Sequence, residues 1–125
     1  MLVLVRIALA IGFLIDASVG LVALFAPQEF QPLFDVPVHD TLVAGIAGGE
    51  FLVVAALYAV TAGNPRRYRA LLWLLALDQL FAVVLPAMAI ANGVLPPTFK
   101  IVAPIPVSAL LVVIFVVGAT RLRRA

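Results

Sequence analysis

The sequence predicts an all-α, polytopic membrane protein, a bundle of four transmembrane helices with both termini in the cytoplasm. Of its 125 residues, 66% are hydrophobic and only 11% are charged, and the mean hydropathy is +1.26, values far from those of soluble domains. Apolar segments of about 20 residues, the length that crosses a bilayer, recur along the chain. Basic residues gather on one side of these segments, which sets the expected orientation.

The whole chain, residues 1–125, is predicted to be a single domain with helices at about 7–26, 41–62, 70–91 and 101–120. The first helix is expected to follow Arg6 and to end at Pro27. A secretory signal is the alternative for this segment. Asp16 interrupts its apolar run, and the segment exceeds the usual signal core of about 7–15 residues, so a membrane helix is favoured.

Prolines, glycines and arginines bound the later helices. The second helix is expected to end at Gly63-Asn64-Pro65, and the third to follow the arginines of 66–69. Pro86 lies inside the third helix and should kink it. The fourth carries prolines at 104 and 106 in its first turns, where a missing amide hydrogen does little harm. Between the first two helices, the prolines of 27–40 make a regular helix improbable.

The basic residues orient the bundle. All seven arginines, at positions 6, 66, 67, 69, 121, 123 and 124, fall on the side of the termini, and Lys100 alone falls on the other. This asymmetry predicts an inner (plasma) membrane protein with both termini inside. The expected partners are the lipid bilayer and either further copies of the chain or a larger membrane complex. Nothing in the pattern indicates nucleic-acid binding.

Polar residues at the middle of the segments are the candidate functional residues. Asp16, Glu50, Asp78 and Ser108 each lie within three residues of a segment midpoint, and Gln79 follows Asp78. An acid at the centre of a membrane helix costs on the order of 2.5–3.5 kcal/mol, so such residues rarely face lipid. We therefore expect these side chains to face inward together and to bind a ligand or a proton.

Two interpretations of this polar layer remain open. No basic residue is expected at the same depth, because Arg6 is about 15 Å along the helix from Asp16 and Lys100 is at the outer edge. The acids should then be partly protonated or should bind something cationic. They could serve as hydrogen-bonding groups between helices, each contact contributing about 0.6–2 kcal/mol, or they could line a functional pocket.

Glycines are the candidate helix-packing residues. Gly12 and Gly20 flank Asp16 at four-residue intervals on the first helix, forming a narrow face for close contact. On the second helix, Gly45, Gly48 and Gly49 belong to a small-residue stretch. At about 100° per residue, Glu50 lies roughly opposite the centre of that helix's small-residue face.

Several chemistries lack the residues that they need. The chain has no cysteine and a single histidine, His39, so we expect no metal site and no haem held by two histidines. Ser108 has no histidine or lysine at its depth to serve as a base. Tyr68 and Trp73 lie near the cytoplasmic arginines and are expected to anchor the bundle at the interface. No cofactor is evident from the residues.

Three segments resemble a known family. They are Arg6 ahead of the first helix, Leu24-Phe25-Ala26-Pro27-Gln28-Glu29-Phe30 at its end, and Ala44-Gly45-Ile46-Ala47-Gly48-Gly49-Glu50 in the second helix. Together they are similar to the DoxX-like superfamily of small bacterial four-helix membrane proteins, with its BphX-like relatives. Some members of that superfamily are subunits of membrane-associated oxidoreductase assemblies that feed the quinone pool, and many have no assigned activity. The resemblance therefore implies at most attachment to such an assembly, with a quinone as the ligand. Thr41-Leu42-Val43 stands where many relatives have a basic residue.

Three functions are compatible with the sequence. The favoured one is a binding or assembly subunit with a midplane acidic pocket for a small lipophilic or quinone-like ligand. The first alternative is a proton-coupled exporter of lipophilic cations, which would use Glu50. The second is an intramembrane isomerase in which one carboxylic acid donates and one carboxylate accepts a proton. An enzyme is thus an alternative and not the favoured function.

Overall fold

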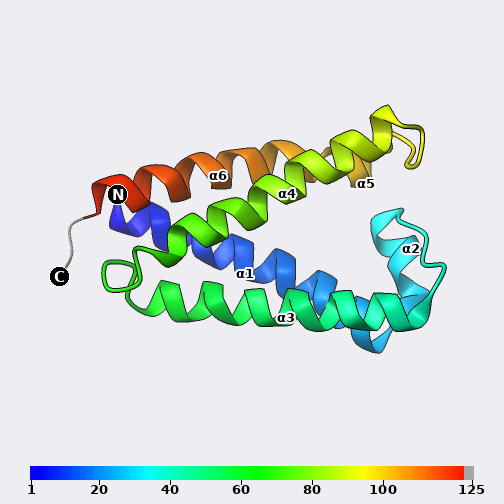
Figure 1. Cartoon of the computed structure of the whole chain (residues 1–125), viewed down its shortest axis with the longest axis horizontal. Coiled ribbons are helices and arrows are strands. Elements are labelled where there is room, and N and C mark those ends of the chain that lie inside the picture. Colours follow the sequence, from blue (N-terminus) through cyan, green and yellow to red (C-terminus); the bar gives the residue numbers. More distant parts are fainter. Residues whose placement is uncertain (123–125) are drawn as a thin grey trace.

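The computed structural model describes residues 1–122, and this part of the chain is helical without β-strands. Its elements are α1 (Leu2–Phe25), the 3-10 helix η1 (Pro27–Glu29), α2 (Phe30–Phe34), α3 (Thr41–Gly63), α4 (Leu71–Ala91), α5 (Phe99–Val102) and α6 (Pro104–Arg121). The predicted four-helix membrane fold is confirmed (Figure 1). Arg123 and Arg124, used above to predict the orientation, lie outside the described residues.

Four helices are long and apolar enough to cross a membrane: α1, α3, α4 and the combined segment Phe99–Arg121. The chain is therefore a multi-pass membrane protein. The described ends of the chain lie together at one end of the bundle, and α2 and α5 lie at the other (Figure 1). We call these the terminal end and the distal end.

The bundle consists of two helix pairs, α1 with α3 and α4 with α6. Glycine backbones bring α1 and α3 close together, because a Cβ added at Gly48 would lie 2.8 Å from the carbonyl oxygen of Gly20. A Cβ added at Gly45 would be in ordinary contact with Leu24 at 3.8 Å, whereas a Cβ at Gly49 would meet nothing within 4 Å. Gly20 and Gly48 thus form the close contact, and Gly49 takes no part in packing within the chain.

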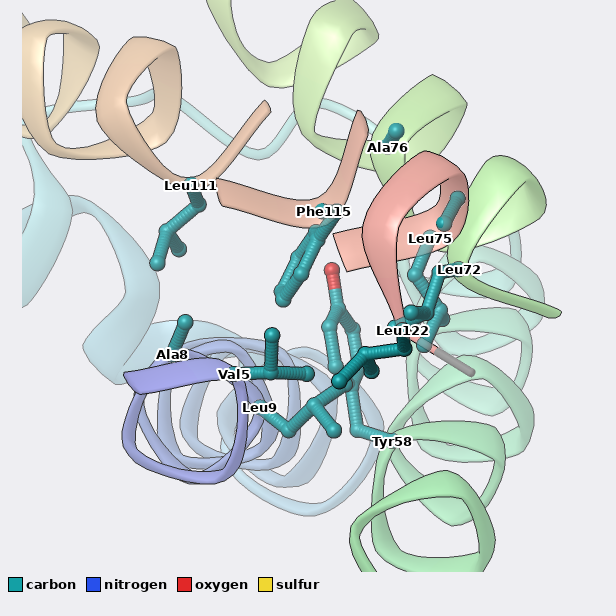
Figure 2. Close-up of a cluster of buried hydrophobic side chains, with 11 residues drawn as sticks. Val5, Ala8, Leu9, Tyr58, Leu72, Leu75, Ala76, Leu111, Phe115 and Leu122 are labelled. Carbon is teal, nitrogen blue, oxygen red and sulfur yellow. The ribbon is translucent and has the colours of Figure 1, made fainter. Parts of the chain in front are cut away.

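The apolar core lies in the half of the bundle nearer the terminal end. Val5 and Leu9 of α1, Leu72 of α4 and Phe115 of α6 are fully buried around the ring of Tyr58 from α3 (Figure 2). Tyr58 and Phe115 also form an aromatic pair with ring centroids 5.9 Å apart. Side chains from both helix pairs therefore fill this half, and Tyr58 lies at their junction.

The first helix begins at Leu2, five residues earlier than predicted, so Arg6 lies within α1 and not ahead of it. Arginine is a good helix former and does not end a helix. Its long side chain instead reaches the end of α3, where Nε donates to the Ala62 carbonyl at 3.3 Å and Nη2 to the Gly63 carbonyl at 3.5 Å. A cation at a helix C-terminus also complements the helix dipole.

The last membrane segment is interrupted at Ala103, which separates α5 from α6. Helical structure already begins at Phe99 in α5, and after the break Pro104 is the first residue of α6 and Pro106 lies in its first turn, as predicted. Pro104 and Pro106 have no amide hydrogen to donate to the carbonyls of Lys100 and Val102. The break follows from the loss of these two closely spaced sites in the hydrogen-bond ladder.

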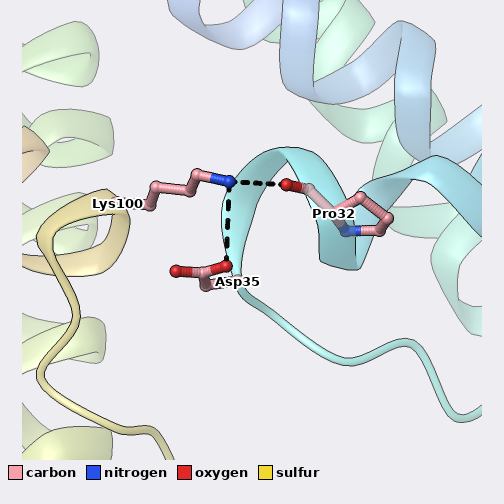
Figure 3. A network of polar contacts seen from close by, with 3 residues as sticks. All are labelled: Pro32, Asp35 and Lys100. Atoms are coloured by element: carbon pink, nitrogen blue, oxygen red, sulfur yellow. Dashed lines mark hydrogen bonds and ion pairs between the residues drawn. The ribbon is translucent and has the colours of Figure 1, made fainter.

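The link between α1 and α3 contains more helix than predicted. Pro27 and Pro32 both lie in short helices, η1 and α2, because proline is tolerated in a first helical turn. Lys100 holds this link to α5, donating from Nζ to the Pro32 carbonyl at 2.7 Å and lying 3.9 Å from an Asp35 carboxylate oxygen (Figure 3). The distal end is thereby closed by polar contacts at the surface.

The close contact of α1 with α3 makes two adjacent glycines behave differently. We expect Gly48→Ala to lower the free energy of unfolding by about 1–3 kcal/mol, since backbone atoms must move to admit the methyl group. Gly49→Ala is the matched control for packing within one chain and should be neutral or slightly stabilising for the detergent-solubilised monomer, because a methyl group there meets no atom of the same chain. Thermal unfolding in detergent measures both. Equal stability of the two variants would contradict the packing described here.

Candidate functional site

Three of the predicted polar residues surround one cavity at the middle of the bundle. Asp16 of α1, Asp78 of α4 and Ser108 of α6 line a space of about 350 Å³, together with Phe51 of α3. All four membrane-spanning segments contribute to it, although α3 does so through Phe51 and not through the predicted Glu50. The rest of its wall is apolar, and includes Val19, Phe81, Leu85 and Pro86.

Asp16 is the most deeply buried of the acids. Its side chain is 3% exposed, and its Oδ2 atom has no hydrogen-bond partner among the described residues. Gly12 and Gly20, four residues away on either side, place α1 close to α3 and leave the carboxyl group of Asp16 between the helices. A buried carboxyl oxygen without a partner is unusual in a folded protein, so this atom has bonding capacity available for a ligand.

Asp78 belongs to a hydrogen-bonded cluster with two neighbours. The Tyr58 hydroxyl donates to Oδ2 of Asp78 at 2.8 Å, and Nε2 of Gln79 donates to the Tyr58 hydroxyl oxygen at 2.7 Å. The same Nε2 lies 3.5 Å from Oδ2 of Asp78. Tyr58 and Gln79 are fully buried, whereas Asp78 is half-buried at the cavity. The cluster joins α3 to α4 and thus one helix pair to the other.

Tyr58 is the site residue that the sequence analysis missed. It lies six residues beyond residue 52, the centre of α3, and therefore outside the three-residue distance from the midpoint that defined the candidate residues. Helical side chains lean toward the N-terminus of their helix, which carries the hydroxyl of a long tyrosine toward the midplane. Gly12 provides the space, because a Cβ there would overlap the Tyr58 ring. A tyrosine within an apolar helix was the available signal.

Glu50 does not join the other acids, and the prediction that all three face inward together is wrong. Its side chain is exposed on the outer surface of α3, and it does not line the cavity. The small residues on the opposite side of α3, Gly48 and Ala55, are buried against the rest of the bundle. Helix geometry then directs residue 50 outward, because the face that packs is the face of small residues.

The cavity opens sideways toward the position of the lipid. Phe81 and Leu85, two of its lining residues on α4, are 52% and 58% exposed. A second space of about 200 Å³ adjoins it at the distal end and shares Val19, Ala82, Pro86 and Pro104 as lining residues. Lys100 and Phe34 line the far side of this second space. The interior is thus least filled where the apolar core is absent.

Pro86 adds an acceptor near the cavity. The helix α4 continues through it, yet its ring nitrogen has no hydrogen to donate to the carbonyl of Ala82. Both residues line the two spaces described above. The site therefore combines carboxyl groups, the Ser108 hydroxyl and a carbonyl deprived of its helical donor, within walls of apolar side chains. Among residues 1–122, no cluster of three histidine or acidic side chains could hold a metal ion.

Comparison with protein-family models, with curated proteins and with solved structures finds no match to this chain.

The hydroxyl of Tyr58 should matter more than that of Tyr68. In Tyr58→Phe, Asp78 loses its closer donor and Gln79 its closer acceptor, and only the 3.5 Å contact between them remains, so we expect a loss of about 1–2 kcal/mol in the free energy of unfolding. Tyr68→Phe is the control, because the Tyr68 hydroxyl forms no hydrogen bond within residues 1–122. Thermal unfolding in lipid nanodiscs measures the difference. A Tyr58→Phe variant as stable as Tyr68→Phe would contradict the role given to this cluster.

Proposed function

We propose that the protein is a membrane-embedded binding subunit whose central cavity receives a small lipophilic ligand with polar oxygen atoms, of the quinone type. The observation that carries the proposal is the unpartnered Oδ2 of Asp16, buried at the wall of an apolar cavity. Pockets for small molecules are mostly apolar, with few polar groups that fix orientation. The cavity fits that description.

The cavity volume supports a ring-sized ligand. At about 350 Å³ it lies at the lower end of the range for small-molecule pockets. Phe51 and Phe81 supply flat apolar surface for a ring, and the partial exposure of Phe81 and Leu85 gives a hydrophobic tail a route to the bilayer. The ligand would therefore enter from the hydrocarbon layer and keep its tail there.

The polar groups favour a ligand that accepts hydrogen bonds. No basic side chain lines the cavity, so Asp16 is most stable there as a neutral acid, which donates one hydrogen bond. A quinone carbonyl accepts such a bond. Asp78 is already engaged by Tyr58, and its proximity to the same cavity makes it the second group for holding or exchanging a proton.

Location and assembly complete the proposal. The arginine asymmetry supports an inner-membrane protein with both termini inside. Membership of the DoxX-like superfamily, and with it attachment to an oxidoreductase assembly, rests on the sequence resemblance alone. The protein would then supply the bound ligand to a partner that carries out electron transfer.

A second candidate is the intramembrane isomerase, because Asp16 and Asp78 line one cavity and would act as its two carboxyl groups. The proton-coupled exporter is less well supported, since Glu50, the residue assigned to that role, is exposed outside the cavity. A shift of a double bond in a bound lipophilic substrate, lost in both Asp16→Asn and Asp78→Asn, would favour the isomerase over the binding subunit.

Two substitutions at Asp16 test the binding proposal. In nanodiscs with an alkylated benzoquinone as the probe, we expect Asp16→Leu to weaken binding about tenfold, because it removes the hydrogen bond. Asp16→Asn keeps a donor and should bind within about threefold of the wild type. A photoreactive version of the probe should label α1 or α4 beside the cavity.

The control for these variants is Ser18→Leu, which makes a similar polar-to-apolar change on an exposed position of α1. It should bind the probe as the wild type does. Saturable binding that Asp16→Leu leaves unchanged, or labelling away from the cavity, would overturn the proposal. Binding of the neutral probe lost equally in the Asn and Leu variants would also contradict the proposal, because the asparagine amide keeps a hydrogen-bond donor at this position.

A further inference from the structure

Glu50 occupies a position that the cavity does not explain. It lies near the centre of α3, a helix that crosses the membrane, and its side chain is exposed on the outer surface. It forms no hydrogen bond or ion pair with any residue from 1 to 122. A carboxyl group facing hydrocarbon at this depth is costly even when protonated, so a partner is needed to cover it.

The surface around Glu50 has the pattern of a helix-pairing face. Val43, Ile46, Glu50, Val53, Leu57 and Val60 follow one another at alternating intervals of three and four residues. Val43, Ile46, Val53 and Val60 are between 49% and 64% exposed, whereas Leu57 is partly buried against the core of its own chain and lies at the edge of this face. An apolar heptad seam that contains one polar residue is typical of two parallel helices, and the polar residue fixes their register.

Gly49 gives this face room for a close approach. A Cβ there would meet nothing within 4 Å in the chain, so this glycine is not used in packing α3 against its own neighbours. Ala56 and Gly63 follow at seven-residue intervals and are exposed, and Gly49 itself is half-buried. Small residues beside a membrane helix contact let two backbones approach, which increases van der Waals contact.

We propose that this face binds a second copy of the chain, with the two Glu50 carboxyl groups hydrogen-bonded to each other across a two-fold axis along the membrane normal. Every copy has the same orientation in the membrane, so the two α3 helices run parallel and bring Glu50 to the same depth. A carboxylic acid both donates and accepts a hydrogen bond and is therefore complementary to itself.

The charges of the chain indicate that two copies would pair through hydrogen bonds and not through a salt bridge to Glu50. The described basic side chains lie toward the ends of the bundle, as Arg6, Arg66 and Lys100 do, so this chain offers no cation at the depth of Glu50. Two protonated carboxyl groups that hydrogen-bond to each other need no such cation. This interface is separate from the cavity, and its test does not depend on ligand binding.

Because the sequence contains no cysteine, a single introduced cysteine can form a disulfide only with the same residue of another copy. Single-cysteine variants Ile46→Cys and Val53→Cys should form disulfide-linked dimers in liposomes under mild oxidation. Leu14→Cys and Leu85→Cys, exposed on other helices, are the controls and should stay monomeric. Cross-linking that is no stronger at positions 46 and 53 than at 14 and 85 would overturn the proposed dimer face.

Substitutions at Glu50 test the carboxyl pair itself. In the Val53→Cys background, Glu50→Leu should weaken dimerisation about three- to twentyfold, whereas Glu50→Gln, whose amide also pairs with itself, should retain it. Dilution into excess lipid and measurement of the cross-linked fraction give these changes. A monomer in pure lipid that acquires a different protein partner in native membranes would contradict the proposal, as would a Glu50→Leu variant that dimerises like the wild type.

Discussion

The hydrogen bond between Tyr58 and Asp78 is the interaction on which the arrangement of the bundle depends. The helices α1 and α3 form one pair through the glycine contact, and α4 and α6 form the other. Direct packing between α3 and α4 is sparse, yet the Tyr58 side chain crosses between them, surrounded by the apolar core and hydrogen-bonded at 2.8 Å to Asp78. In hydrocarbon no water competes for this bond, so both groups must find partners in protein.

This junction also explains where the cavity lies. Large apolar side chains fill the bundle from the terminal end up to the Tyr58 ring, and the space beside Asp78 continues toward the distal end. There the prolines of α4 and of the α5–α6 segment remove backbone hydrogen bonds. The contact of Gly20 with Gly48 joins α1 to α3 at this end but does not bring either helix closer to α4 or α6. The unfilled volume therefore coincides with the polar groups that need a partner, among them Asp16.

Much of this architecture could be predicted from the sequence, because segment length and hydropathy dictate where a chain crosses a bilayer. Depth along each segment also identified Asp16, Asp78 and Ser108 as neighbours. Depth alone was insufficient for Glu50, since its orientation depends on which face of α3 packs. The small-residue face of that helix already indicated that Glu50 points away. Identifying Tyr58 as a site residue would have required the direction in which its side chain leans. Placing the break between α5 and α6 would have required knowing that helical structure begins at Phe99.

The most direct measurement of the central claim is the separation of the Tyr58 and Asp78 side chains in a lipid bilayer. Solid-state NMR on protein labelled at the tyrosine ring and at the aspartate carboxyl carbons would report it. We expect a strong dipolar contact assigned to this pair and its loss in Asp78→Leu. A Tyr58 ring without contact to any aspartate carboxyl, in a protein that retains its helices, would contradict it.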